Sequence, residues 1–303
     1  MITIGAKLQP FSHKPGQRCA IPGTKIIVEA YPSLVRIDGR EVLLDIEGPL
    51  RQFTLLQDLE RGCVTIFSEK YRFHILPNGE IIHKKLSGLP IIPREKLSLG
   101  SHKSQEWERK KTFAQIFPVW FALGRLIQAK GEFPLLDICK QTVALNRPER
   151  VLPAFERLFL SGFSHMMVPR LYDDDFQAIS QSGGKGDPFV LLSEGAILIR
   201  SLFIQSTKQQ VSILPHLPPE FHTGRFCHLA VDTALLDMEW SKKQIRRIAL
   251  LAKNEGEIEW RFSPDIKRYR LRIDQAKKGD IKSVRESLVI KSDTLYLLDQ
   301  FEK

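Results

Sequence analysis

Three consecutive carboxylates, Asp173 to Asp175, are the groups in this chain best suited to acid–base chemistry. Arg170 precedes them and Gln177 follows, so the stretch combines charge with hydrogen-bonding side chains. Adjacent carboxylates repel one another, so at least one is expected to be solvated, paired with Arg170, or bound to a metal or a substrate. We therefore take Arg170, Asp173, Asp175 and Gln177 as candidate ligand-binding residues. A loop of solvated acids is the alternative.

A catalytic acid and base would need more than this one run. Inverting glycoside hydrolysis uses two carboxyl groups on opposite sides of the scissile bond, with room for a water. Asp173 and Asp175 come from one segment and are poorly placed to flank a bond, whereas Asp175 opposite Glu106 or Glu194 would be a better pair. The ligand spacing of an EF-hand is absent.

A second constellation combines aromatic and hydrogen-bonding side chains. His102, Gln105 and Glu106 fall within one expected helical turn, and Trp107 follows them directly. A pyranose has an apolar face and a ring of hydroxyls, so a carbohydrate site pairs an aromatic platform with polar groups. Trp107 would be that platform and Trp120 a second one. The alternative is that a preceding serine caps the helix and Trp107 fills the core.

Other motifs predict no cofactor. The glycine-rich stretch 183–186 has Gly where a Walker motif needs Ser or Thr after the lysine, so it reads as a loop tip. His216, His222 and His228 lack accompanying acidic or cysteine ligands at metal-site spacing. We therefore expect neither a metal nor an organic cofactor.

A basic region near the C-terminus predicts an acidic partner as an alternative function. Basic strands with aromatic residues can bind single-stranded nucleic acid through phosphate contacts and base stacking. Tyr269 lies among the basic residues. A solvated sheet face is the simpler interpretation. The basic residues are Lys242, Lys243, Arg246, Arg247, Lys267, Arg268, Arg270, Arg272, Lys277 and Lys278.

Composition favours a soluble globular protein. Hydrophobic residues make up 43% of the 303 residues and charged residues 26%, with a net charge of +10. No secretory signal and no apolar run long enough to span a membrane is visible, and the four cysteines form no Cys-x-x-Cys motif. These observations predict a cytoplasmic protein that does not enter the membrane.

Three regions differ in their expected secondary structure. Residues 1–93 read as an antiparallel β-sandwich, with Asp38–Gly39 and Asn78–Gly79 as two-residue hairpin turns. Residues 94–206 read as helical, and residues 207–303 as a second β-domain. The expected helices are residues 105–117, 118–129, 134–145, 148–161 and 188–205. The fold class predicted is thus α+β and multidomain.

The passage from the last helix into the second β-domain carries a recognisable pattern. Its residues are Leu202, Phe203, Ile204, Gln205, Ser206, Val211, Leu214, Pro215, Leu217, Pro218, Pro219, Glu220, Phe221, Gly224, Phe226, Leu229, Val231, Leu236, Asp237, Met238, Glu239 and Trp240. This stretch resembles the junction in the inverting α-L-fucosidase family of glycoside hydrolases, where an (α/α) six-hairpin barrel passes into a C-terminal β-sandwich. In that family the junction is scaffold, so the resemblance transfers no catalytic residue to this chain.

The resemblance implies a carbohydrate-active or carbohydrate-binding protein, and inverting hydrolysis if the chain is an enzyme. About 105 residues hold only five or six helices of ~12 residues each, which is half of such a barrel. A partial, (α/α)-type helical layer would expose apolar faces, so we expect self-association. A nucleic-acid-binding protein and a non-catalytic assembly subunit remain as alternatives.

Overall fold

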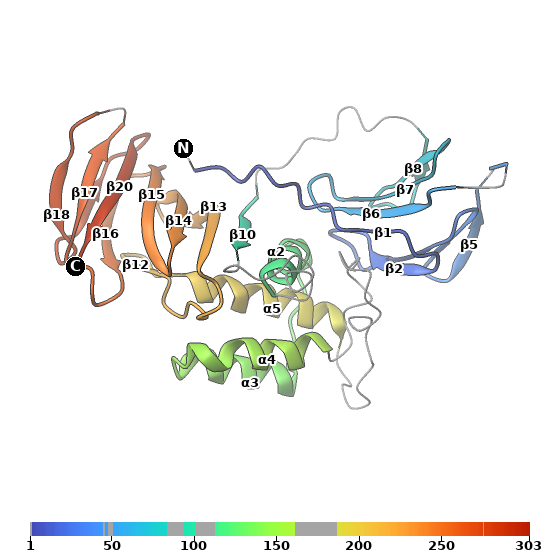
Figure 1. The fold of residues 1–303 in the computed structure, drawn as a ribbon, viewed down its shortest axis with the longest axis horizontal. Coiled ribbons are helices and arrows are strands. Elements are labelled where there is room, and N and C mark those ends of the chain that lie inside the picture. Colours follow the sequence, from blue (N-terminus) through green and yellow to red (C-terminus); the bar gives the residue numbers. More distant parts are fainter. Residues whose placement is uncertain are drawn as a thin grey trace.

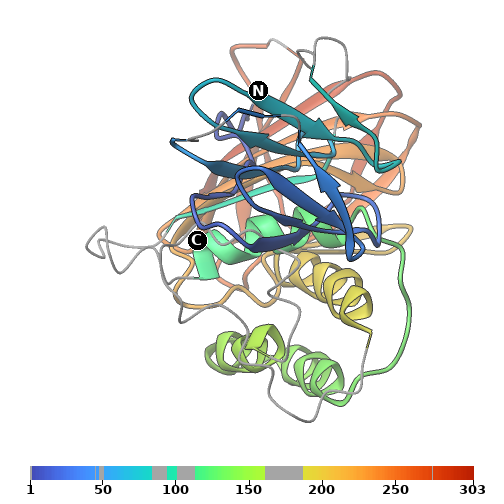
Figure 2. The same cartoon turned by 90° about the vertical axis from the view of Figure 1, so that its right-hand side faces the viewer.

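The computed structural model describes residues 2–44, 46–47, 51–83, 94–100, 113–160, 187–274 and 276–303. Strands form both ends of the molecule, and the described helices lie on one side of them (Figures 1 and 2). Four described helices and several antiparallel sheets make up the fold, which confirms the α+β class. None of the described helices is long and apolar enough to cross a membrane.

The N-terminal region is a sandwich of two antiparallel sheets. Strands β1 (Phe11–Ser12), β6 (Thr54–Asp58), β7 (Cys63–Phe67), β8 (Arg72–Ile75) and β9 (Ile81–Ile82) form one sheet. Strands β2 (Gln17–Ala20), β3 (Ile27–Ala30), β4 (Leu34–Ile37) and β5 (Arg40–Leu43) form the other. Apolar side chains from both sheets, among them Val28, Val35, Leu55 and Ile66, make one buried cluster between them. The sandwich expected here is therefore confirmed.

The two predicted hairpins both form, but with different turns. Asp38 and Gly39 have φ of 48° and 80° and connect the paired residues Ile37 and Arg40, as a two-residue turn requires. At the second hairpin Gly79 has a positive φ of 81° and Asn78 does not. The loop there spans three residues, because the Leu76 amide donates to the Glu80 carbonyl. The prediction of a two-residue turn at Asn78–Gly79 is therefore wrong.

The described helices are α2 (Phe113–Gly124), α3 (Pro134–Ala144), α4 (Pro148–Leu160) and α5 (Pro188–Phe203). Helix α2 packs against α5, and α3 packs against α4, without closing into a barrel. Pro118 lies inside α2, so the predicted break between two helices at this position is wrong. The cost of proline is outweighed because Phe117, Trp120 and Phe121 are buried on both sides of it. Helix α5 ends at Phe203, slightly before the predicted end.

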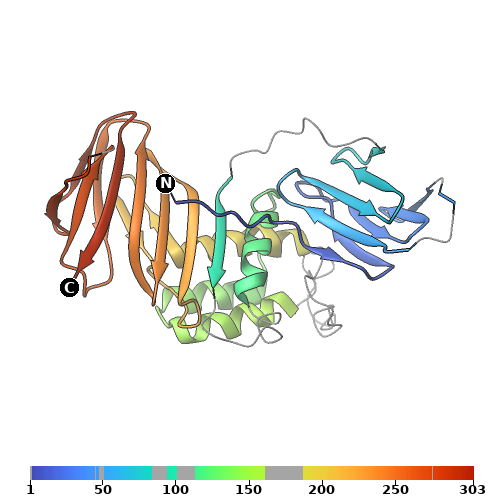
Figure 3. The same ribbon diagram turned by 45° about the horizontal axis from the view of Figure 1, so that its top comes forward.

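The C-terminal region contains a seven-stranded antiparallel sheet and a smaller four-stranded sheet. The large sheet has the order β10 (Lys96–Gly100), β13 (Thr223–Val231), β14 (Ala234–Ser241), β15 (Gln244–Ala252), β20 (Leu295–Glu302), β17 (Arg268–Ile273) and β18 (Asp280–Ser283). The small sheet has the order β11 (Ile204–Ser206), β12 (Gln210–Ile213), β16 (Gly256–Arg261) and β19 (Leu288–Ile290). Figure 3 shows the large sheet face-on with the helices behind it.

The helices and the C-terminal sheets share one hydrophobic core. Phe121 of α2 meets Phe226 of β13, with ring centroids 5.1 Å apart, and Phe203 of α5 lies 5.4 Å from Trp240 of β14. Strand β10 comes from the segment expected to be helical, yet it forms the edge of the large sheet. Residue 206, where we expected the boundary between the helical region and the second β-region, therefore lies within one hydrophobic core. Strand β11 follows α5 directly, without a loop.

Candidate functional site

Most of the residues predicted to bind a ligand lie outside the described part of the chain. These residues are His102, Gln105, Glu106, Trp107, Arg170, Asp173, Asp175 and Gln177. Their candidacy stays a prediction.

Trp120, the remaining predicted ligand-binding residue, is a core side chain. It is fully buried, and its ring lies near Phe117 and Phe155. The indole Nε1 donates to the carbonyl oxygen of Leu192 at 3.2 Å. The ring also covers Gly195 of α5 so closely that a Cβ there would overlap it. Such a side chain offers no face to a sugar, so Trp120 is corrected from a binding residue to a packing residue.

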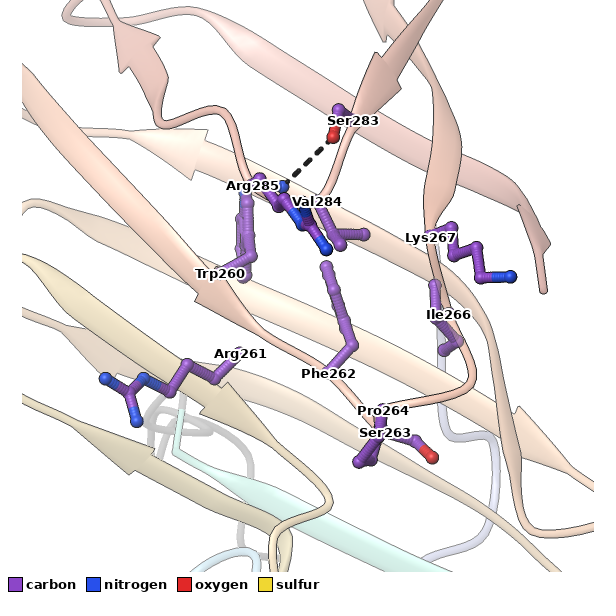
Figure 4. Close-up of a pocket in the computed structure, with 10 residues that line it drawn as sticks. All are labelled: Trp260, Arg261, Phe262, Ser263, Pro264, Ile266, Lys267, Ser283, Val284 and Arg285. Carbon is purple, nitrogen blue, oxygen red and sulfur yellow. Dashed lines mark hydrogen bonds between the residues drawn. The ribbon is translucent and has the colours of Figure 1, made fainter.

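A pocket of about 530 Å³ opens at one end of the C-terminal sandwich. The connection from β16 to β17 forms one wall, and the connection from β18 to β19 forms the other (Figure 4). Backbone hydrogen bonds from Val284 to the Lys267 carbonyl and from Lys267 to the Glu302 carbonyl hold the walls together. The lining residues are Trp260, Arg261, Phe262, Ser263, Pro264, Ile266, Lys267, Ser283, Val284 and Arg285.

Aromatic rings form the inner side of the pocket. Trp260 and Phe262 stack with centroids 5.6 Å apart and an interplanar angle of 17°. Phe262 also contacts the edges of Tyr269 and Phe301. Trp260 is only 5% exposed, and its Nε1 has no hydrogen-bond partner among the described residues. A buried donor without an acceptor is costly, so this indole N–H is a place where a ligand oxygen would be favourable.

Three cations line the pocket around these rings. Arg261, Lys267 and Arg285 line the pocket, and none of them has an ion-pair partner in the described ranges. Figure 4 shows Arg285 beside Trp260 and Phe262, whereas Arg261 and Lys267 extend away on either side. The lining contains no Asp, Glu, His or Cys, so it offers no usual metal ligand and no carboxyl acid or base.

The three arginines of the basic strand predicted to bind nucleic acid are all paired with acids of their own sheet. Arg268 pairs with Glu302 at 2.6 Å, and Arg270 and Arg272 both pair with Asp299, at 2.7 and 2.6 Å. These partners lie on β20, beside β17.

Asp299 of β20 and Tyr269 of β17 both have shifted pKa values. Burial acts to raise the pKa of Asp299, but hydrogen bonds and attraction from Arg270 and Arg272 outweigh it and keep that pKa below its ordinary value. Tyr269 is 1% exposed and therefore presents no ring to a base. Burial, reinforced by the charge of Glu286, raises the pKa of Tyr269 to about 12.

The sequence contained part of the signal for this pocket. Ile258 and Trp260 alternate with glutamates in β16, which marks Trp260 as an inward-facing strand residue. Nothing in the local sequence indicates that Ser283 to Arg285 form the opposite wall, because β18 and β19 follow β16 only after β17 intervenes.

No family model and no curated protein matches this chain. The pocket and the junction at residues 202–240 are therefore the features of the chain that bear on its function.

Proposed function

We propose that this protein binds a carbohydrate without hydrolysing it, and that it is a reduced relative of the (α/α)-barrel glycoside hydrolases. The observation that carries the proposal is the pocket at the end of the C-terminal sandwich. It combines stacked aromatic rings with hydroxyl and guanidinium donors and contains no carboxylate.

The chemistry of the lining matches the two surfaces of a sugar ring. The half-buried ring of Phe262 offers an apolar surface for the C–H face of a pyranose, and the buried ring of Trp260 stacks against it. Ser263, Ser283 and Arg285 offer hydrogen bonds to its hydroxyls. The buried indole N–H of Trp260 lacks an acceptor within the described structure, and a sugar oxygen that reached it would supply one.

Binding without hydrolysis follows from the absence of carboxyl groups in the lining. Both retaining and inverting glycosidases use a pair of carboxylates around the scissile bond. This pocket contains none, so a bound glycosidic bond would meet neither an acid nor a base.

The residues that carry the family resemblance have a scaffold role here as well. Phe203, Phe221, Phe226 and Trp240 are all buried in the common core. Trp240 donates from Nε1 to the Phe221 carbonyl at 3.1 Å, which fixes the passage from helix to sheet. These contacts support shared ancestry at the junction and leave ligand binding to the pocket.

Titration with neutral and acidic oligosaccharides, followed by calorimetry, tests the proposal. Replacing Phe262 by Ala should weaken binding of the best saccharide about tenfold, which corresponds to the loss of ~1.4 kcal/mol of ring contact. Phe11→Ala is the matched control, because Phe11 is 37% exposed in the N-terminal sandwich. Melting temperatures of both variants separate lost binding from lost folding. If no saccharide binds the intact protein, the proposal is wrong.

An assembly subunit is the second candidate, and a specific observation favours it. Ile138 and Leu145, in and just after α3, and Ile197 in α5 are 43%, 66% and 50% exposed. Exposed apolar side chains on neighbouring helices are typical of an interface. Sedimentation of the protein with and without an Ile197→Lys substitution tests this, since a stable oligomer should dissociate in the variant.

A further inference from the structure

Strand register brings a second group of cations to the end of the sandwich that holds the pocket. Ser241 pairs with Gln244 across the β14–β15 turn, and Glu302 pairs with Arg268, which itself pairs with Ser283. The β14–β15 turn therefore lies at the same end of the sheet as the pocket walls. Figure 3 shows the arrowheads of β14 and β20 at this common end.

Six exposed cations gather there without ion-pair partners among the described residues. Two acids near these cations have ion-pair partners: Glu302 pairs with Arg268, and Asp265 pairs with Lys303. Two exposed carboxylates in this area lack a described cation partner, Glu220 before β13 and Glu286 between β18 and β19. Positive charge therefore prevails over this surface. The cations are Lys242, Lys243, Arg246, Arg261, Lys267 and Arg285.

The two lysines of the β14–β15 turn, Lys242 and Lys243, have an unfavourable backbone conformation. The φ angles of these residues are 54° and 62°, so both lie in the left-handed region. A two-residue turn of this kind strongly prefers Asn-Gly or Asp-Gly, and lysine there is strained. Strained backbone conformations are enriched at binding sites, and two adjacent exposed lysines in such a turn suit the binding of an anion.

We infer that the ligand is an acidic polysaccharide that occupies the pocket and continues across the sheet end to Lys242 and Lys243. This inference rests on the proposed carbohydrate binding and adds the charge and length of the ligand. Two strand spacings separate β15 from β17, which places the turn about 10 Å from the pocket strands. One sugar ring cannot contact both places, whereas a chain of several rings can.

The same surface is less suited to single-stranded nucleic acid. Binding of that kind uses several exposed aromatic rings, on which successive bases stack. Among the described residues of 207–303 no Phe, Tyr or Trp side chain is exposed, and the half-buried Phe262 offers the pocket one ring face, which suits one sugar ring better than a series of bases. The cations that remain unpaired therefore suit carboxylate or sulfate groups on a sugar chain better than stacked bases.

The inference can be tested with oligomers of galacturonate and mannuronate, their methyl esters, and an oligothymidylate. The acidic oligomers should bind at least ~10-fold more tightly than the uncharged esters at low salt, and their affinity should fall as salt is raised. The double substitution Lys242→Asn and Lys243→Gly removes both charges while introducing the residues that the turn prefers. This variant should lose about tenfold in affinity for the acidic oligomers, keep its affinity for the esters, and melt no lower than the parent.

The control removes the same charge away from the Lys242–Lys243 turn, through Lys208→Asn and Lys253→Asn. Both lysines are exposed; Lys208 lies in the turn between β11 and β12, and Lys253 directly follows β15. The control should bind the acidic oligomers as the parent does. Equal affinity for acids and esters would overturn the inference and leave carbohydrate binding intact. Tighter binding of oligothymidylate than of any acidic oligomer would overturn it in favour of nucleic acid, and failure of every saccharide to bind would overturn both proposals.

Discussion

In the described part of the C-terminal region, cations gather on two surfaces, and they differ in whether acids pair with them. On the outer face of the large sheet, Arg225 and Arg247 pair with Glu239, at 3.1 and 2.9 Å. Farther along the same face, Arg270 and Arg272 pair with Asp299. At the end of the sheet, the cations around the pocket have no such partners among the described residues. The position of acids on neighbouring strands, and not the number of cations, therefore decides which surface attracts an anion.

The largest expected effect is loss of the acid on the paired face. Asp299→Ala should lower the free energy of unfolding by about 2–3 kcal/mol, because it leaves two partly buried guanidinium groups without their acceptor. Urea unfolding measures this. Asp265→Ala is the matched control: its partner Lys303 is 63% exposed, so the change should be small. Equal effects of the two substitutions would show that the comparison between the surfaces is mistaken.

Acid should weaken the paired face in a defined pH range. The pKa of Asp299 is lowered in the folded protein, so its ion pairs contribute fully above its unfolded pKa of about 3.9 and are lost as pH falls through the folded value. The difference in unfolding free energy between the parent and Asp299→Asn should thus be constant near neutral pH and shrink below about pH 4. Unfolding curves across this range measure it. A difference that persists undiminished at the acid end would assign the stabilisation to something other than the carboxylate charge.

The unpaired end should gain stability when its strained turn is relieved. Lys243→Gly should raise the free energy of unfolding by about 0.5–1 kcal/mol, because glycine adopts a positive φ without the penalty of a side chain. Thermal unfolding at fixed pH detects the change. Lys253→Gly is the control, since Lys253 does not have a positive φ and should not be stabilised. A loss of stability in Lys243→Gly would mean that the lysine side chain makes a stabilising contact in the fold.

The smallest effect should come from the single cations at the pocket. Lys267→Ala should change the unfolding free energy by less than about 0.5 kcal/mol, because an exposed side chain without an ion pair contributes little to the fold. The same substitution should reduce the salt dependence of acidic-oligosaccharide binding. Parallel denaturation and binding measurements separate the two roles, and a clear loss of stability would contradict the assignment of this surface to ligand binding.

The sequence predicted local features well and long-range pairing poorly. The order of sheet, helices and sheet, and the turn at Asp38–Gly39, follow from residue types within a few positions. By contrast, the alternation in β17 correctly predicted a basic strand face, but the acids that neutralise it lie 27 to 34 residues later along the chain, on β20. Pro118 misled the prediction of helices because tertiary burial outweighed its local cost. The candidate pocket depends on two connections brought together by the sheet, and no local pattern encodes that.

Strand β10 determines where the molecule can be divided for recombinant study. Residues 96–100 form the edge of a sheet whose other strands all follow residue 222. An expression plasmid that encodes residues 207–303 would omit this edge together with α2 and α5, and it would leave Phe226 and Trp240 open to solvent. We expect such a fragment to aggregate. A cut near residue 94 keeps every strand of the large sheet, but it removes the Ile2 and Thr3 carbonyls that accept hydrogen bonds from Cys227 and Arg225 of β13. We therefore expect residues 94–303 to fold with the large sheet intact and with lower stability than the full chain.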